Sequence, residues 1–303
     1  MTITTHIIHT TISTWVSSIA KLSSTAKDGC RRSRAGTCEC ENSNPIPEKD
    51  SPTTRQANGS VAQVEDAKHL ATGRTPAHAL LEFCGVAMFF GLAATTAKRV
   101  YDRFVNDGVS STTVCRVGVA LVLGILAADL VSGIVHWAAD NWGSSSLPGV
   151  GAAFIRPFRH HHIDPHAITR HGFLELNGNN FIVSLPLLWA AASAITSPDG
   201  ASSLASASFW LSFALCCGLT NQVHSWAHMK NPPRLVRGLQ DSGLLLSRQH
   251  HHLHHIRPHD CNYCITTGWM NRPLTAIGFF EGVERAITAV TGAVPLHKHL
   301  RND

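Results

Sequence analysis

Histidine clusters are the feature of this sequence that points most directly to chemistry. Twenty of the 303 residues are histidines, and the densest cluster, at 250–255, reads His-His-His-Leu-His-His. On a helix, His250 and His254 lie four residues apart on one face, and so do His251 and His255. Imidazoles that leave a short helix in more than one direction can reach two metal ions. A solvated, metal-buffering tract is the alternative, but the sequence around this cluster is of ordinary complexity.

Two further pairs have the same helical spacing. His224 and His228 are four residues apart, and so are His136 and Asp140. Asp129 precedes His136 by seven residues and therefore falls on the same helix face. Two ligands at this spacing can bind one metal ion from a single helical turn.

A fourth cluster consists of consecutive histidines next to a predicted turn. His160, His161 and His162 precede Asp164-Pro165, a dipeptide that favours a turn. Neutral imidazole suits iron, copper, nickel or zinc. One zinc ion takes about four ligands, so this many imidazoles indicates two metal ions, or one site with a wide surround of supporting histidines.

Four apolar stretches must position these clusters, at 79–97, 117–135, 181–196 and 201–223. A bilayer core needs roughly 20 helical residues, which the first, second and fourth stretches supply; the third is shorter and contains Pro186. We therefore predict an all-α, polytopic membrane protein with about four transmembrane helices. A di-metal site beside a bilayer favours O2 chemistry on a lipid chain, because unactivated C–H bonds offer nothing to an acid or a base.

The span count predicts which clusters share a side of the membrane. With four spans, both i,i+4 pairs emerge on the side that also holds the C-terminal segment 229–303. That segment carries nine Lys and Arg residues, and the short loop between the third and fourth spans carries none. The positive-inside rule therefore predicts that the metal site faces the cytosol, although Lys98, Arg99, Arg103 and Arg116 run against it.

The chain divides into a disordered or targeting segment at 1–75 and a membrane domain at 76–303. Twelve of the first 25 residues are Ser or Thr, and Asp28 is the first acidic residue, a bias typical of organelle transit peptides. The net charge is only +5, and no basic run is interleaved with aromatics, so nucleic acid is excluded as a partner. Nine scattered cysteines argue against a disulfide scaffold.

The ordered motifs resemble those of the Kua/CarF-type lipid desaturases, which include the plasmanylethanolamine desaturases. The resemblance covers about residues 80–290 and excludes the N-terminal 75. It rests on these runs: Asp129-Leu-Val-Ser-Gly-Ile-Val-His136-Trp, Phe154-Ile-Arg-Pro-Phe-Arg, His161-His-Ile-Asp-Pro, Ile168-Thr-Arg-His171, Thr220-Asn-Gln-Val-His224-Ser-Trp-Ala-His228, His250-His-x-x-His-His and Cys264-Ile-Thr-Thr-Gly-Trp269.

The resemblance implies a membrane-bound, non-haem di-iron enzyme of the endoplasmic reticulum, with two iron ions and O2 as co-substrate. It would form the vinyl ether of plasmalogens from an O-alkyl ether phospholipid, with electrons from cytochrome b5 or a similar donor. Carried over residue by residue, the implied ligands are His136, Asp140, His161, His162, His224, His228, His250, His251, His254 and His255. His171 and His259 are implied as ligands or as side chains that support one, and Asp129 is expected to orient an imidazole.

Three alternatives remain. A plant branch of the family desaturates an acyl chain of plastid phosphatidylglycerol, and the Ser/Thr-rich start would suit a plastid protein; the Asp164-Pro165 turn and His171 favour the ether-lipid branch. A histidine-rich metal transporter should place ligands near mid-membrane, but only Asp129 and Glu82 lie inside apolar stretches. A membrane-anchored zinc hydrolase is the third alternative, but the sequence contains no His-Glu-x-x-His motif to support it.

Overall fold

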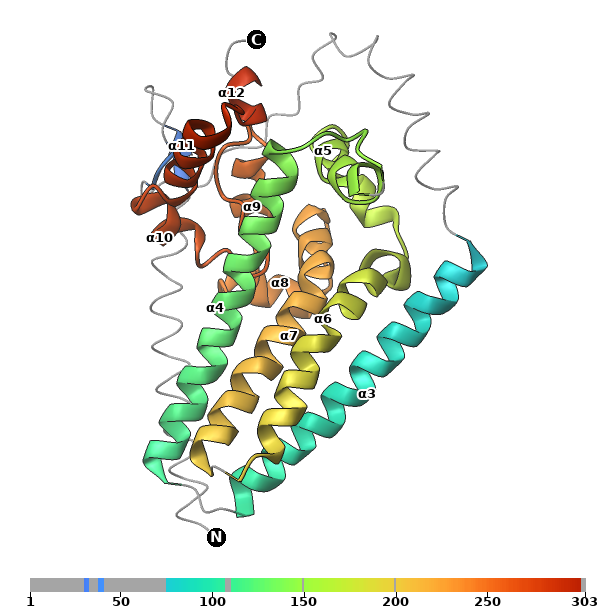
Figure 1. Cartoon of the computed structure of the whole chain (residues 1–303), viewed down its shortest axis with the longest axis vertical. Coiled ribbons are helices and arrows are strands. Elements are labelled where there is room, and N and C mark those ends of the chain that lie inside the picture. Colours follow the sequence, from blue (N-terminus) through green and yellow to red (C-terminus); the bar gives the residue numbers. More distant parts are fainter. Residues whose placement is uncertain are drawn as a thin grey trace.

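Long helices form the framework of the protein (Figure 1). The computed structural model describes residues 30–32, 38–40, 75–106, 110–148, 150–198 and 200–300. Within these residues, four helices are long and apolar enough to cross a membrane, which confirms the predicted span count. They are α3 (Pro76–Asn106), α4 (Ser111–Asn141), α6 (Phe173–Thr196) and α7 (Ala201–His228).

The helices run beyond the apolar stretches that predicted them. Helix α4 begins after an N-cap, where the Ser110 hydroxyl accepts the backbone N–H of Thr113, and it ends at Asn141. Helix α6 contains Pro186 yet continues to Thr196. Because α6 begins at Phe173, its 24 residues are enough for a full crossing, so the expectation of a short third span was wrong.

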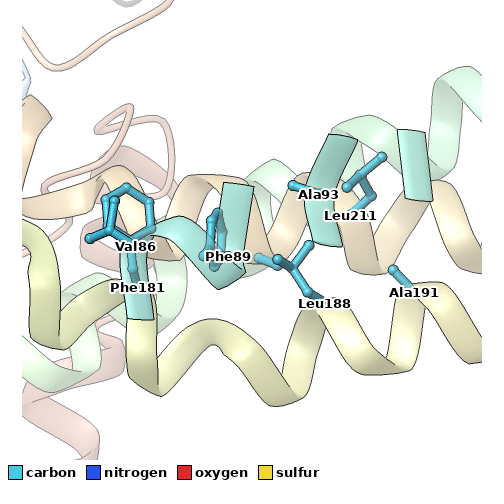
Figure 2. Close-up of a cluster of buried hydrophobic side chains, with 8 residues drawn as sticks. Val86, Phe89, Ala93, Phe181, Leu188, Ala191 and Leu211 are labelled. Atoms are coloured by element: carbon cyan, nitrogen blue, oxygen red, sulfur yellow. The ribbon is translucent and has the colours of Figure 1, made fainter. Parts of the chain in front are cut away.

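Helix α7 is central, since it packs against α3, α4 and α6. The core between α3, α6 and α7 is built around Phe89 and Phe181, whose ring centroids are 4.7 Å apart (Figure 2). Gly218 of α7 makes room for them, because a Cβ there would lie 2.7 Å from the Phe181 ring. This core fixes the bundle but contains no candidate ligand.

The shorter elements gather toward the end where α4 and α7 finish (Figure 1). Both i,i+4 pairs therefore lie at the same end of the bundle, as the span count predicted. The elements are η2 (Gly151–Ile155), α5 (Arg156–His161), η3 (Ala167–Arg170), α8 (Arg234–Asp241), α9 (Arg248–His254), α10 (Asn271–Ala276), α11 (Phe279–Thr291) and α12 (Leu296–Leu300).

Two features depart from a simple helical bundle. Residues 261–270 form a largely buried irregular loop, the C-terminal loop, which contacts Asp129 of α4 and Thr220 of α7. Strands β1 (Cys30–Arg32) and β2 (Cys38–Cys40) pair antiparallel, with Cys30 opposite Cys40. Apart from these two strands and Thr75, the segment 1–75 that was predicted to be disordered or targeting lies outside the described residues.

Candidate metal centre

Nine of the ten predicted ligands converge into two adjacent groups. In each group the potential ligand atoms all lie within 4.8 Å of one another. We call the first the five-histidine group; it consists of His161, His224, His228, His251 and His255. We call the second the Asp140 group; it consists of His136, Asp140, His162 and His254.

Helical periodicity explains how each element contributes to the groups. Helix α7 supplies two residues to the five-histidine group, and α4 supplies two to the Asp140 group, each pair from successive turns. The C-terminal ends of α5 and α9, each with the residue that follows, contribute to both groups, because adjacent histidines on a helical turn point about 100° apart. The two groups are consequently held side by side by the same two short helices.

The five-histidine group consists of four buried imidazoles and the half-buried His255, whose Nε2 atoms face one another. His224 and His251 have Nε2 atoms 2.8 Å apart, and those of His161 and His228 are 2.9 Å apart. The Nε2 of His255 lies 3.0 Å from that of His251. A neutral imidazole carries one N–H, so five facing nitrogens cannot all satisfy each other by hydrogen bonding. A cation at their centre would accept all five lone pairs.

The Asp140 group brings a carboxylate among three imidazoles. Oδ1 of Asp140 lies 3.1 Å from Nε2 of His162, and Oδ2 lies 3.3 Å from His136 and 3.4 Å from His254. Within the described residues, none of these buried oxygen and nitrogen atoms makes a well-formed hydrogen bond. Buried polar atoms without partners are rare in folded proteins, so these four residues fit a metal ion.

Backbone carbonyls of the C-terminal loop orient two imidazoles of the Asp140 group. Nδ1 of His136 lies 3.0 Å from the carbonyl oxygen of Tyr263, and Nδ1 of His254 lies 2.8 Å from that of Cys261. A carbonyl can only accept, so each Nδ1 carries the proton and donates it. Each Nε2 is then an unprotonated lone pair that faces the group, as metal binding requires.

The electrostatics of the clusters favour neutral, ligand-competent imidazoles. Burial, followed by the neighbouring imidazoles, holds the pKa of His161, His251 and His255 well below its usual range. The pKa of His254 is lowered by burial as well, partly offset by the nearby carboxylate of Asp140. A metal ion at neutral pH would therefore displace no proton from these four residues.

His250 and His171 lie outside both groups. The ring of His250 packs against the C-terminal loop, where a Cβ on Gly268 would lie 3.2 Å from it. His171 is exposed, and its Nδ1 pairs with Oε1 of Glu175 at 3.0 Å. The structure thus does not bring these two predicted residues to a metal position.

His259 and Asp129 belong to neither group but contact residues or segments next to the Asp140 group. The His259 ring lies 4.3 Å from that of His162, centroid to centroid, and its Nδ1 donates to the carbonyl of His254. Burial lowers the pKa of His259 to about 4. Asp129 was expected to orient an imidazole, but its carboxylate instead accepts backbone N–H groups of the C-terminal loop.

Other supporting residues went unnoticed in the sequence. Arg159 donates from Nε to the carbonyl of Ala139 and from Nη2 to those of Trp142 and Gly143, which fixes α5 to the end of α4. Its place in the Arg-Pro-Phe-Arg run was the available signal. The carbonyls of Cys261 and Tyr263 gave none, because every residue type has a carbonyl.

A buried polar cluster attaches the C-terminal helices to the far side of α4. The Trp137 indole donates to Oε1 of Glu284 at 2.9 Å, and Nδ1 of His297 donates to Oδ1 of Asn141 at 2.8 Å. Asn141 in turn donates to the Tyr263 hydroxyl. Trp137 and Asn141 each adjoin a member of the Asp140 group, so α11 and α12 brace the helix that carries those residues.

Comparison with known proteins agrees with this architecture. A lipid desaturase domain model matches residues 125–298. The chain is 43% identical over 246 residues to plasmanylethanolamine desaturase from Myxococcus xanthus, covering 80% of this chain and 83% of that protein. It is 43% identical over 256 residues to plasmanylethanolamine desaturase 1 from Mus musculus, covering 82% and 92%.

No solved structure matches the chain. A plastid relative is similar over a shorter part of it. Fatty acid desaturase 4, chloroplastic, from Arabidopsis thaliana is 40% identical over 180 residues, covering 57% of this chain and 52% of that protein. The domain match includes α9 and most of α4, and with them both candidate metal groups. The chain belongs to the lipid desaturase family.

Proposed function

We propose that this protein is a plasmanylethanolamine desaturase, which introduces the vinyl-ether double bond into the alkyl chain of an O-alkyl ether phospholipid. The observation that carries the proposal is the pair of convergent ligand groups at one end of a four-helix membrane bundle. The 43% identity to two relatives of that name over about four fifths of the chain supports the choice of substrate.

The two groups fit two iron ions, one in each. Bound iron together with O2 supplies an oxidant strong enough to take hydrogen from an unactivated C–H bond. Two hydrogens leave the chain, and these, with two electrons from a donor and two protons, reduce O2 to two water molecules. The donor we propose is cytochrome b5 or a similar carrier.

The protein's own residues hold and orient the metals. The eight histidines of the two groups present lone pairs, and Asp140 supplies the one anionic ligand among them. Four of these residues lie on α4 and α7, which are candidate membrane spans, so an alkyl chain in the bilayer can approach without leaving it. Which two carbons react must then be fixed by positioning, because a long chain offers many nearly equivalent C–H bonds.

We infer that the site faces the cytosol from the endoplasmic reticulum membrane. The nine Lys and Arg residues of segment 229–303 support this orientation, because that segment carries α9 and lies at the site end of the bundle. The alternative is a plastid membrane, where the protein would desaturate an acyl chain of phosphatidylglycerol. This location and activity are the second candidate, because the match to the chloroplast relative covers less of the chain.

A metal transporter is disfavoured by the placement of ionisable groups. A transport pathway needs ligands available near mid-membrane. The Asp129 carboxylate is occupied by four backbone N–H groups, so it has no free face for a passing ion. The convergent histidines lie instead toward the ends of α4 and α7 and in the segments beyond them.

The test is lipid analysis of cells that lack vinyl-ether lipids but receive O-alkyl precursors. We expect acid-labile vinyl ethers with the wild-type chain and none with His254→Ala. His252→Ala is the matched control, because His252 lies in the same run but is exposed and outside both groups; it should behave as wild type. Well-expressed protein that holds two irons and makes no vinyl ether would overturn the proposal, and phosphatidylglycerol would be assayed next.

A further inference from the structure

The C-terminal loop is an irregular backbone segment buried beside two membrane-spanning helices. Irregular backbone is tolerated at such depth only where protein groups satisfy its polar atoms. The backbone N–H of Cys264 donates to Asn271 Oδ1, and that of Ile265 donates to the Ser132 hydroxyl. The next amides along the chain converge on a single side chain, that of Asp129.

Asp129 accepts four backbone N–H groups from the loop. Oδ1 accepts those of Thr266, Thr267 and Gly268 at 3.1, 2.8 and 2.9 Å, and Oδ2 accepts that of Met270 at 2.9 Å. The carboxylate is fully buried. Hydrogen bonds to an ionised acceptor are roughly twice as strong as neutral ones, so this contact is the main attachment of the loop to α4.

The attached loop is also the one that orients two proposed ligands. The carbonyls of Tyr263 and Cys261 accept the Nδ1 protons of His136 and His254. Between these carbonyls and the Asp129 contacts, Cys264 packs so closely on Gly133 that a Cβ there would lie 2.4 Å from Sγ. A shift of the loop along α4 therefore moves both carbonyls away from their imidazoles.

The five-histidine group has a different kind of support. Among the described residues, Nδ1 of His251 and Nδ1 of His255 have no hydrogen-bond partner. The members of this group lie on α5, α7 and α9 and at His255, which directly follows α9, and no loop carbonyl holds either of these two rings. Loosening the C-terminal loop should consequently affect one metal position and spare the other.

We propose that Asp129 is a positioning residue for the Asp140 group alone. It holds the C-terminal loop in register on α4, and the loop carbonyls in turn hold His136 and His254 with their Nε2 atoms toward Asp140. The proposal rests on the proposed function only in requiring that both groups bind metal. It assigns to Asp129 no contact with substrate or metal.

The test is titration of the metal-free, full-length protein in detergent with Co²⁺, followed by absorbance. We expect two ions per wild-type chain and, in Asp129→Asn, one site unchanged and one weakened 10- to 100-fold, the range for loss of a support behind a ligand. Asp129→Ala should weaken that site further, because Asn keeps one acceptor oxygen. Phe89→Leu, in the core of Figure 2, is the destabilised control and should keep both sites.

A double-mutant comparison assigns the weakened site. In an Asp140→Ala background, where the Asp140 group is already broken, adding Asp129→Asn should leave the remaining cobalt site unchanged. In a His251→Ala background, where the Asp140 group is intact, adding the same change should weaken one cobalt site 10- to 100-fold. Equal effects in both backgrounds, or wild-type titrations for Asp129→Asn alone, would overturn the proposal.

The readout separates this proposal from the proposed function. Cobalt binding needs no lipid, electron donor or turnover. A wild-type chain that binds fewer than two cobalt ions would remove the two-metal premise and overturn both. A chain that binds two ions with the expected Asp129 dependence but makes no vinyl ether would leave this inference standing and overturn only the choice of substrate.

Discussion

The two groups of candidate ligands are both built mainly from histidines, and each includes an i,i+4 pair from a long helix, yet they differ in charge and in support. The five-histidine group offers five neutral ligands and no anion. The Asp140 group offers three imidazoles and one carboxylate, and two of its imidazoles are fixed by loop carbonyls. The five-histidine group has more candidate ligands, whereas the Asp140 group has fewer but holds two of them in a fixed orientation.

This difference has consequences for how each group should respond to damage. Removing one histidine from five still leaves four ligands, which is enough for a stable metal site. Removing one member of the Asp140 group leaves three, and removing Asp140 itself also removes the only negative charge. The groups should therefore differ in metal retention even where turnover is lost from both.

The largest expected effect is that of Asp140→Ala compared with His251→Ala. Both changes should abolish vinyl-ether formation, because the two metals are expected to act as a unit. Asp140→Ala should lower the iron content from two ions per chain to one, whereas His251→Ala should keep most of both, since four histidines remain in its group. Metal analysis of purified proteins measures this, and equal iron contents in the two variants would erase the distinction.

The second effect tests the loop support of the Asp140 group. In Gly133→Ala the new Cβ would lie 2.4 Å from Cys264 Sγ, and overpacking of this kind costs about 1–3 kcal/mol. We expect a lower thermal midpoint and selective loss of metal from the Asp140 group. Gly91→Ala is the matched control in α3, where a Cβ meets nothing within 4 Å.

A compensating change makes the Gly133 prediction sharper. In Gly133→Ala with Cys264→Ala the sulfur is gone, and the remaining neighbours are backbone atoms at 3.3 and 3.4 Å. These contacts are tight but tolerable, so metal content should largely recover. Failure of the double variant to recover would mean that the thiol, and not the fit of the loop, is what the Asp140 group needs.

The same contrast explains what sequence reasoning could predict. The four spans follow from apolar length. His161 and His162 were predicted from their cluster and from the family resemblance, whereas the other seven convergent residues each have a partner at i,i+4 spacing. His250 shares that spacing with His254 but lies one turn earlier in α9, where its ring meets the loop at Gly268. Which side of a short helix faces a metal depends on packing that spacing alone does not specify.

The support of the site was less predictable than its ligands. Asp129 stood out as a charge in an apolar stretch, but its partners are backbone amides more than 130 positions later in the chain. The carbonyls that orient His136 and His254 belong to Tyr263 and Cys261, whose side chains carry no sign of that role. Such contacts follow from the path of the loop, which no local pattern specifies.

A smaller effect is expected from pH on the metal-free protein. Burial depresses the pKa of His161, His251 and His255 in the folded state, so below about pH 6.5 the unfolded chain binds protons that the folded chain rejects. Stability should therefore fall on acidification, by up to about 1.4 kcal/mol per pH unit for each such histidine. Thermal midpoints between pH 7.5 and 5.5 measure this.

The five-histidine group should dominate that pH dependence. His255→Gln removes one buried imidazole from it and should make the acid-induced fall in thermal midpoint shallower. His252→Gln, at an exposed position of the same helix, is the control and should leave the slope unchanged. Identical slopes in both variants would show that the acid sensitivity arises elsewhere in the chain.

The smallest effect is expected at His171, which the family resemblance placed near the ligands. Its pair with Glu175 is exposed, with 41% and 35% of the two side chains accessible, and exposed pairs contribute only about 0–1 kcal/mol. His171→Ala should keep two irons per chain and change vinyl-ether formation less than about threefold, an energy difference within that range. Loss of a metal ion from this variant would mean that the ligand set extends beyond the two groups. The contrast between five neutral histidines and a carboxylate with three histidines, two of them anchored, would then have to be redrawn.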